Sequence, residues 1–97
     1  MVKGYLLGQI TISDKSHYKL YDSKIGNVIE KFGGRYLVKG GLRMVNEGIP
    51  SFQRDVLVEF KDIETAQRFF SSQRFKEISR FRKAGSTGFL LLLNGKE

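Results

Sequence analysis

The first third of the chain predicts a strand followed by a long amphipathic helix. Residues 4–12 are rich in Leu and Ile and are typical of a strand, and Ser13 and Asp14 after them are helix-capping residues. Apolar side chains then recur at helical spacing as far as Gly33 and Gly34, where a helix can end because glycine adopts positive φ freely. The apolar stripe of this predicted helix consists of Tyr18, Tyr21, Ile25, Val28, Ile29 and Phe32.

The remaining chain predicts two strands, a divided helical region and a last strand. Glycine and proline interrupt the pattern between the two strands, and a pair of serines interrupts the helical spacing, so two short helices are expected. These segments are strands at 35–40 and 55–60, a helical region that begins near Asp62 and breaks at Ser71-Ser72, and a strand at 88–94.

The element order β-α-β-β-α-β is that of ferredoxin-like α+β folds, in which two helices cover one face of a four-stranded antiparallel sheet. The second face of this sheet is not expected to lie in water, because residues 89–93 of the last strand are apolar at every position. The economical cover for that face is a second copy of the chain, packed sheet against sheet. The sequence therefore predicts a homodimer.

Charge complementarity predicts the register of the two middle strands. Residues directly opposite in an antiparallel pair have a constant sum of positions, and opposite charges facing each other are favoured. One register sets two pairs of opposite charges across the strands. In this register one face of the two strands is wholly apolar and is expected to meet the helices. This register also allows a bulge or bend at Gly40-Gly41. Its pairs are Arg35 with Glu59, Tyr36 with Val58, Leu37 with Leu57, Val38 with Val56, and Lys39 with Asp55.

Length and composition narrow the class of protein. A chain of 97 residues is expected to form one domain, residues 1–97. It has no cysteine, which excludes a disulfide framework, a thiolate metal site and a cysteine nucleophile. No apolar run approaches the ~20 residues of a membrane-spanning helix, and no secretory signal is evident, so a cytoplasmic protein without membrane partners is expected.

The formal charge of +7 is concentrated in the basic run at 68–83, which raises the question of nucleic acid. RNA-recognition modules share the element order, and their third strand carries aromatic side chains that stack on bases. In that frame the stacking positions fall on Asp55 and Leu57, and an acidic side chain repels phosphate. The basic run is therefore interpreted as a solvated helix face, and specific nucleic-acid binding is not expected.

Several segments together resemble the bacterial family known as domain of unknown function 1330. They are KGYLLGQI, FGGRYLVKGG at 32–41, LVEF followed by KDIETAQRFF, and SSQRFKEISRFRKAG. The resemblance implies a ferredoxin-like chain of the dimeric α/β-barrel superfamily, and so a dimer, but no settled activity. The chain departs from the family where Phe75 replaces a frequent tyrosine, so any contact through that hydroxyl is lost.

His17 and Tyr21 are the candidates for catalysis. His17 is the only histidine, and histidine titrates near neutral pH, which suits general acid or base chemistry. It lies at the border of the apolar stripe, so the alternative is a half-exposed surface residue. No second histidine or cysteine completes a metal site, and no glycine-rich loop suits a nucleotide, so neither a metal nor a cofactor is expected.

Arg82 and Tyr18 are the candidates for ligand binding. The spacing of Phe75, Ile78 and Arg82 follows one helical face and would bring a guanidinium to the edge of an apolar pocket. There it could bind a carboxylate or phosphate in bidentate fashion. The structural alternative is a salt bridge, or an arginine whose stem packs while its head stays in water.

Three functions follow from these features. The leading hypothesis is a homodimeric domain that binds a small anionic or aromatic organic molecule between sheet and helices. The second is a cofactor-independent monooxygenase-like or isomerase-like enzyme, which the resemblance to the superfamily implies. The third is non-specific nucleic-acid binding through the basic run at 68–83.

Overall fold

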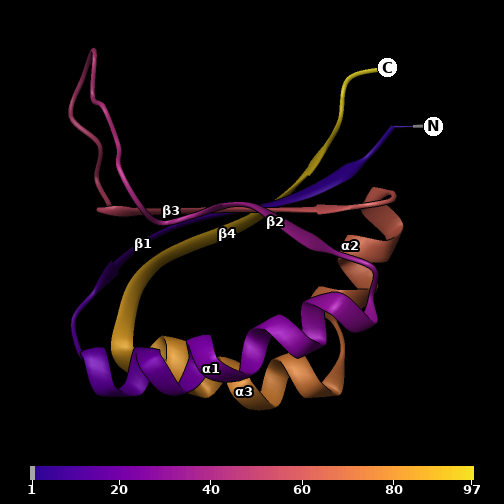
Figure 1. Ribbon diagram of the computed structural model, residues 1–97, viewed down its shortest axis with the longest axis horizontal. Helices are drawn as coiled ribbons and strands as arrows, with labels where there is room; N and C mark the ends of the chain where they lie inside the picture. Colours follow the sequence, from indigo (N-terminus) through magenta and orange to yellow (C-terminus); the bar gives the residue numbers. More distant parts are fainter. Residues whose placement is uncertain (1) are drawn as a thin grey trace.

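A four-stranded antiparallel sheet and three helices form the part of the chain that the computed structural model describes, residues 2–97 (Figure 1). The strands lie in the order β2-β3-β1-β4. This is the predicted ferredoxin-like α+β fold, with the second helical region divided in two as expected. The elements are β1 (Gly4–Ile12), α1 (Lys15–Lys31), β2 (Arg35–Lys39), β3 (Arg54–Phe60), α2 (Ile63–Phe70), α3 (Gln73–Gly85) and β4 (Ser86–Asn94).

Each helix begins at a side chain that accepts hydrogen bonds from its first free amides. The Asp14 carboxylate accepts from the amides of Ser16 and His17 at 3.0 and 3.2 Å. Asp62 and Ser72 cap α2 and α3 in the same manner. The capping signals in the sequence therefore determine where the helices start.

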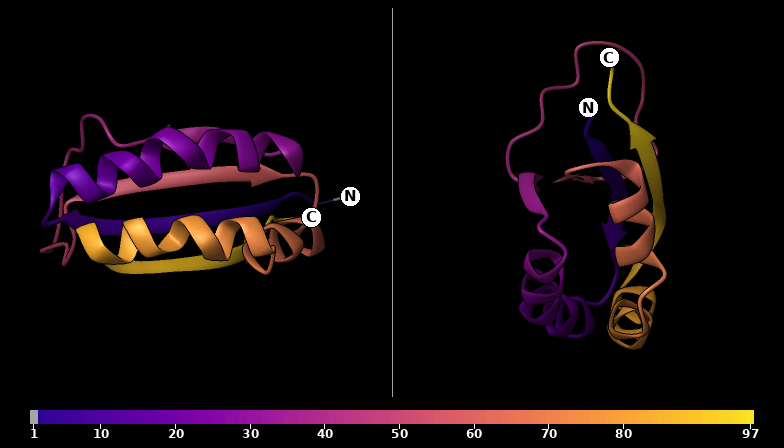
Figure 2. Two further views of the ribbon diagram at one scale, coloured as in Figure 1. Left: turned by 90° about the horizontal axis from the view of Figure 1, so that it is seen from below. Right: turned by 90° about the vertical axis from the view of Figure 1, so that its right-hand side faces the viewer.

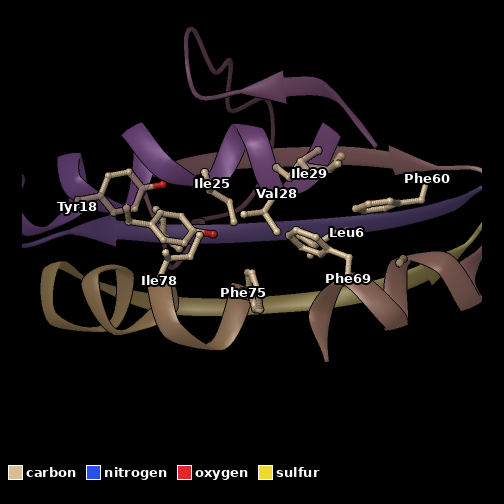
Figure 3. Close-up of a cluster of buried hydrophobic side chains, with 13 residues drawn as sticks. Leu6, Tyr18, Ile25, Val28, Ile29, Phe60, Phe69, Phe75 and Ile78 are labelled. Carbon is tan, nitrogen blue, oxygen red and sulfur yellow. The ribbon is translucent and has the colours of Figure 1, made fainter. Parts of the chain in front are cut away.

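The helices lie on one face of the sheet and bury the core against it. Figure 2 shows α1 and α3 side by side across this face. The predicted stripe of α1 points inward, and Figure 3 shows Tyr18 at one end of the buried cluster and Phe60 at the other. Aromatic rings fill the latter end, with ring centres 5.2 Å apart between Phe60 and Phe69 and 4.8 Å apart between Phe69 and Phe75.

The predicted register of β2 and β3 is correct at one end of β2 and wrong at the other. Arg35 lies opposite Glu59, and its Nε is 3.0 Å from the Glu59 carboxylate. A bulge at Leu37 then shifts the ladder by one residue. The observed pairs are Arg35 with Glu59, Tyr36 with Val58, Val38 with Leu57, and Lys39 with Val56, in place of the predicted Leu37–Leu57, Val38–Val56 and Lys39–Asp55.

The bulge turns two side chains to faces other than those predicted, because side chains of a strand alternate between its faces. Val38 is exposed instead of meeting the helices, and Lys39 turns to the helix side, where its Nζ lies 3.5 Å from Asp22 of α1. Gly40 and Gly41, where we expected a bulge or bend, bend the chain out of the sheet with φ of 65° and 84°.

The face of the sheet away from the helices is left uncovered, and it carries apolar side chains beside polar ones such as Gln9 and Glu59. We call it the uncovered face; its apolar side chains include Leu7, Leu57, Phe89, Leu91 and Leu93. Leu91, on the edge strand β4 and opposite Leu7 of β1, is 43% exposed. This confirms that the helices of one chain cover only one side of the sheet.

Residues 40–53, which we call the arm, join β2 to β3 and project from the uncovered face (Figure 1). The Arg43 guanidinium donates to both oxygens of Asp55, at 2.7 and 2.8 Å, and to the carbonyl of Phe52. Although it is anchored in this way, the arm presents Leu42 and Ile49 to solvent, 92% and 97% exposed.

Within residues 2–97, none of the helices combines the length and the apolar character that crossing a membrane requires.

Candidate functional site

A cavity lies between α1, α3 and the covered face of the sheet. Its floor is Gly8 of β1, which sits between Val56 of β3 and Leu90 of β4 in the ladder. A Cβ atom at Gly8 would come within 2.8 Å of a Leu90 methyl group, so the absence of a side chain lets Leu90 pack against the β1 backbone at the floor. The enclosed part of the cavity has a volume of about 30 Å³, and it shares lining residues with two larger surface hollows, Arg54 with one and Arg82 with the other.

Three tyrosines supply the aromatic and polar wall of the cavity. Tyr18 and Tyr21 come from successive turns of α1, with ring centres 5.7 Å apart, and Tyr36 comes from β2. Burial raises the pKa of Tyr21 to about 12, and it also raises the pKa values of Tyr18 and Tyr36. All three hydroxyls are therefore protonated at neutral pH and can donate hydrogen bonds to a ligand.

Two arginines flank the tyrosine pair. The guanidinium carbon of Arg54 lies 5.8 Å from the centre of the Tyr18 ring, and that of Arg82 lies 5.6 Å from the centre of the Tyr21 ring. We call the sequence of contacts Arg54, Tyr18, Tyr21, Arg82 the arginine–tyrosine row. Such contacts between a guanidinium and an aromatic face are favourable, and they place both cations at the cavity.

The fold orients each arginine by its immediate surroundings. Arg54 is the first residue of β3 and lies opposite Ile10. Its guanidinium occupies the space beside Gly40, where a Cβ atom would collide with it. Arg82 stands in the last turn of α3, donates to the Ser79 hydroxyl at 3.2 Å and stacks over Phe75.

Neither arginine of the row has an acidic partner. Within residues 2–97 the ion pairs join His17 to Asp14, Arg35 to Glu59, Lys39 to Asp22 and Arg43 to Asp55. The Nε of Arg54 is also buried without a hydrogen-bond acceptor. Asp22 is the one acidic residue that lines the cavity, and Lys39 compensates its charge, so the site carries an excess of positive charge.

The structure brings Tyr18, Tyr21 and Arg82 together, as the sequence suggested, but it separates His17 from them. The His17 ring lies at the start of α1, with Nδ1 2.8 Å from the Asp14 carboxylate, and its side chain is 49% exposed. It is not among the residues that line the cavity. The hydrogen bonds from Ser16 and His17 hold the pKa of Asp14 well below its usual range, which fits a helix cap.

Sequence reasoning missed Arg54, Tyr36, Lys39 and Asp22 as members of the site. The period of two in β3 could have indicated Arg54, because Phe60, Val58 and Val56 share its face. Lys39 gave no such signal, since its orientation depends on the bulge at Leu37.

The cavity has no metal-binding cluster around it. In the described part of the chain, residues 2–97, no three His, Cys, Asp or Glu side chains gather closely enough to hold a metal ion.

The sheet order and the site between sheet and helices define a ferredoxin-like α+β domain. A family model covers nearly all of it. The chain belongs to the family described as Domain of unknown function (DUF1330), whose model matches residues 3–96. No curated protein matches the chain.

Solved structures confirm the fold. RPA0582 from Rhodopseudomonas palustris, a protein of unknown function, superimposes with a TM-score of 0.80 at 15% identity, over 99% of this chain and 84% of that one. SnoaB from Streptomyces nogalater, a cofactor-independent oxygenase, gives a TM-score of 0.66 at 11% identity, over 100% and 96% of the two chains. A hypothetical Arabidopsis thaliana protein gives 0.60 at 12% identity, over 99% and 87%.

Proposed function

We propose that this chain binds a small organic acid in the cavity between the sheet and the helices. The observation that carries the proposal is the arginine–tyrosine row, where two guanidiniums without acidic partners flank protonated phenols beside an apolar floor. The guanidinium groups only donate hydrogen bonds, and the protonated phenols beside them can donate as well, so the site favours a ligand rich in acceptor oxygens. The apolar floor at Val56 and Leu90 favours a hydrocarbon body over a sugar or a polyol.

The cavity supports binding better than turnover. A cofactor-independent oxygenase such as SnoaB shares the fold, and an enzyme of that general kind is the alternative function. Proton abstraction needs a base with a pKa near the working pH. Burial raises the pKa values of Tyr21 and Tyr36, Asp22 is held by Lys39, and His17 lies outside the cavity, so the described site offers no well-placed base.

A thermal-shift and calorimetric screen of small carboxylic acids tests the proposal. We expect at least one acid to raise the melting temperature of the wild-type chain, and the gain to be strongly reduced in Arg82→Gln. The matched control is Arg80→Gln, which removes an equal charge from the same helix where Arg80 stacks over Phe81. An acid whose effect is the same in wild type and Arg82→Gln, or a screen without any binder, would contradict the proposal.

We propose in addition that a second copy of the chain covers the uncovered face. The proposal is supported by the apolar side chains of β1, β3 and β4 on that face and by the arm, which projects on the same side with its apolar residues in solvent. Burying such area is the main driving force for stable association. Sedimentation velocity at micromolar concentration should give twice the chain mass, and a monomer would contradict the dimer.

A further inference from the structure

We infer that the ligand of the cavity carries two anionic groups, one bound by Arg54 and the other by Arg82, with an apolar body that crosses the floor at Gly8. The inference rests on the proposed function and adds the chemical class of the acid, a dicarboxylic acid. Its starting point is that the two cations lie over different rings of the tyrosine pair and border different hollows at the surface of the chain.

The two guanidiniums lie over different rings of the tyrosine pair. Arg54 contacts Tyr18 at 5.8 Å, the Tyr18 and Tyr21 ring centres are 5.7 Å apart, and Arg82 contacts Tyr21 at 5.6 Å. The arginines also come from different layers, since Arg54 belongs to β3 in the sheet and Arg82 to α3 above it. One carboxylate has its oxygens about 2 Å apart and is suited to a single guanidinium fork, which leaves the other arginine for a second group.

Each end of the cavity leads to a hollow at the surface of the chain. At the Arg54 end, a hollow of about 270 Å³ is shared with Tyr18 and Asp22 and bordered by Lys15 and Lys19. At the Arg82 end, a hollow of about 410 Å³ adjoins Leu90 and is bordered by Lys83 and Thr87. Anionic groups can therefore approach both arginines, and lysines stand at both approaches.

Electrostatics favours a dianion over a monoanion. A single carboxylate would compensate one guanidinium and leave the other half-buried without a counter-charge, which is unfavourable in a partly desolvated site. The buried Nε of Arg54 also lacks an acceptor, and a ligand oxygen at that end would supply one. A carboxylate at each end satisfies both requirements.

The middle of the cavity restricts what may link the two carboxylates. Gly8 lies between Val56 and Leu90 at the floor, and the side chains of these two neighbours are hydrocarbon. A hydroxylated linker would lose hydrogen bonds to water without replacing them against Val56 and Leu90. A methylene chain or a benzene ring meets the apolar floor without this loss.

Isothermal titration calorimetry of the full chain with matched acids tests the inference. The probes are hexanedioate, octanedioate and terephthalate, each compared with the monoacid of the same skeleton, namely hexanoate, octanoate and benzoate, at one fixed salt concentration. We expect at least one diacid to bind about tenfold or more tightly than its monoacid, which is the gain from a second charge-assisted contact.

Variants of Arg54 and Arg82 test whether each arginine binds one carboxylate of the diacid. Arg54→Gln and Arg82→Gln should each reduce the binding of the diacid to that of its monoacid, whereas the control Arg80→Gln should leave both unchanged. Arg54→Lys keeps the charge and should retain more of the diacid preference than Arg54→Gln. Circular dichroism reports the fold of each variant, and the ratio of diacid to monoacid in wild type decides the inference even where a variant does not fold.

The outcomes separate this inference from the proposed function. Equal binding of diacid and monoacid, with sensitivity to both arginines, would show that the two guanidiniums share one carboxylate; it would overturn the two-ended site and leave the proposed function standing. No binding by any of the six acids would overturn both.

Discussion

Single residues determine the site as much by the atoms they lack as by those they carry. Gly8 provides the space in which Leu90 packs at the floor of the cavity, and Gly40 provides the space for the Arg54 guanidinium. Arg54 and Arg82 bring cations to a wall of phenols whose protons are retained because burial disfavours the phenolate. Small changes at these positions should therefore alter ligand binding before they alter the fold.

Gly8→Ala should weaken binding of an organic acid and leave the chain folded. The added Cβ would meet the end of the Leu90 side chain at 2.8 Å, and a terminal methyl group can rotate away at a cost of about 1–3 kcal/mol or less. The new methyl group would, however, occupy the cavity. Urea unfolding and calorimetry measure the two effects, and Gly26→Ala, which has open space around it on α1, is the matched control. Unchanged affinity in Gly8→Ala would place the ligand elsewhere.

Tyr21 should make the fold sensitive to alkaline pH. Burial raises the pKa of Tyr21 to about 12 from the ordinary value of 10.0 that it has when unfolded, so above pH 10 the unfolded state releases its proton and the folded state keeps it. Stability present below pH 10 is thus lost as the pH rises to 12, by about 1.4 kcal/mol per pH unit for one proton. In Tyr21→Phe, urea unfolding should show a shallower decline over this range, and the tyrosinate absorbance should lose one late step. An equally steep decline would contradict the assignment.

At the scale of the elements, the bulge in β2 determines which way Lys39 points, and the arm that follows determines which apolar side chains are exposed. One extra residue at Leu37 turns Lys39 toward α1, where it neutralises Asp22 at the cavity. Beyond it, the arm leaves the sheet and is held by Arg43 against Asp55, and the hydrogen bond from Arg43 keeps the pKa of Asp55 below its usual range. The loop is therefore a positioned segment with an apolar surface.

Replacing Leu42 and Ile49 of the arm by serine should weaken the proposed dimer without affecting the fold of a single chain. Both side chains are almost fully exposed, at 92% and 97%, so they contribute little to intramolecular packing. In a dimer their burial would contribute about 1.5–3 kcal/mol for each fully buried side chain. The dissociation constant from sedimentation equilibrium should rise at least tenfold. Leu20→Ser, an exposed apolar residue on the helix layer, is the control, and an unchanged constant in the arm variant would show that the arm is not in the interface.

At the scale of the whole molecule, one face of the sheet is covered by helices and the other face is not. The helices bury the core on the first, whereas the second exposes leucines and a phenylalanine next to the arm. Exposed apolar patches of this kind mark association surfaces in soluble proteins. The basic run at 68–83 belongs to the other layer, and one of its charges, Arg82, is directed to the cavity. Weak, salt-dependent binding of nucleic acid by the remaining charges stays a prediction.

Leu91→Arg should convert the proposed dimer into a folded monomer. Leu91 is 43% exposed in the single chain, so an arginine there keeps its charge in water. In a sheet-to-sheet dimer the same charge would be buried without a partner, which is strongly unfavourable. Sedimentation velocity should give the monomer mass while circular dichroism remains that of wild type. A variant that stays dimeric would place the interface on another surface.

The sequence by itself determined the element order, the helix starts at Asp14, Asp62 and Ser72, and the inward stripe of α1. These features depend on residues within a few positions of each other, through side-chain period and capping hydrogen bonds. It also indicated Tyr18, Tyr21 and Arg82, because helical spacing places them toward the sheet.

Only the tertiary structure decided the rest of the site. Arg54 meets Tyr18 across 36 positions of sequence (54 − 18), and Lys39 meets Asp22 only because a one-residue bulge reverses its face. Charge pairing favoured Lys39 with Asp55, but Asp55 is bound by Arg43 of the arm, a partner whose position depends on the path of the loop. Contacts between distant segments depend on where the sheet, the helices and the arm come together, and no local period of the sequence carries that information.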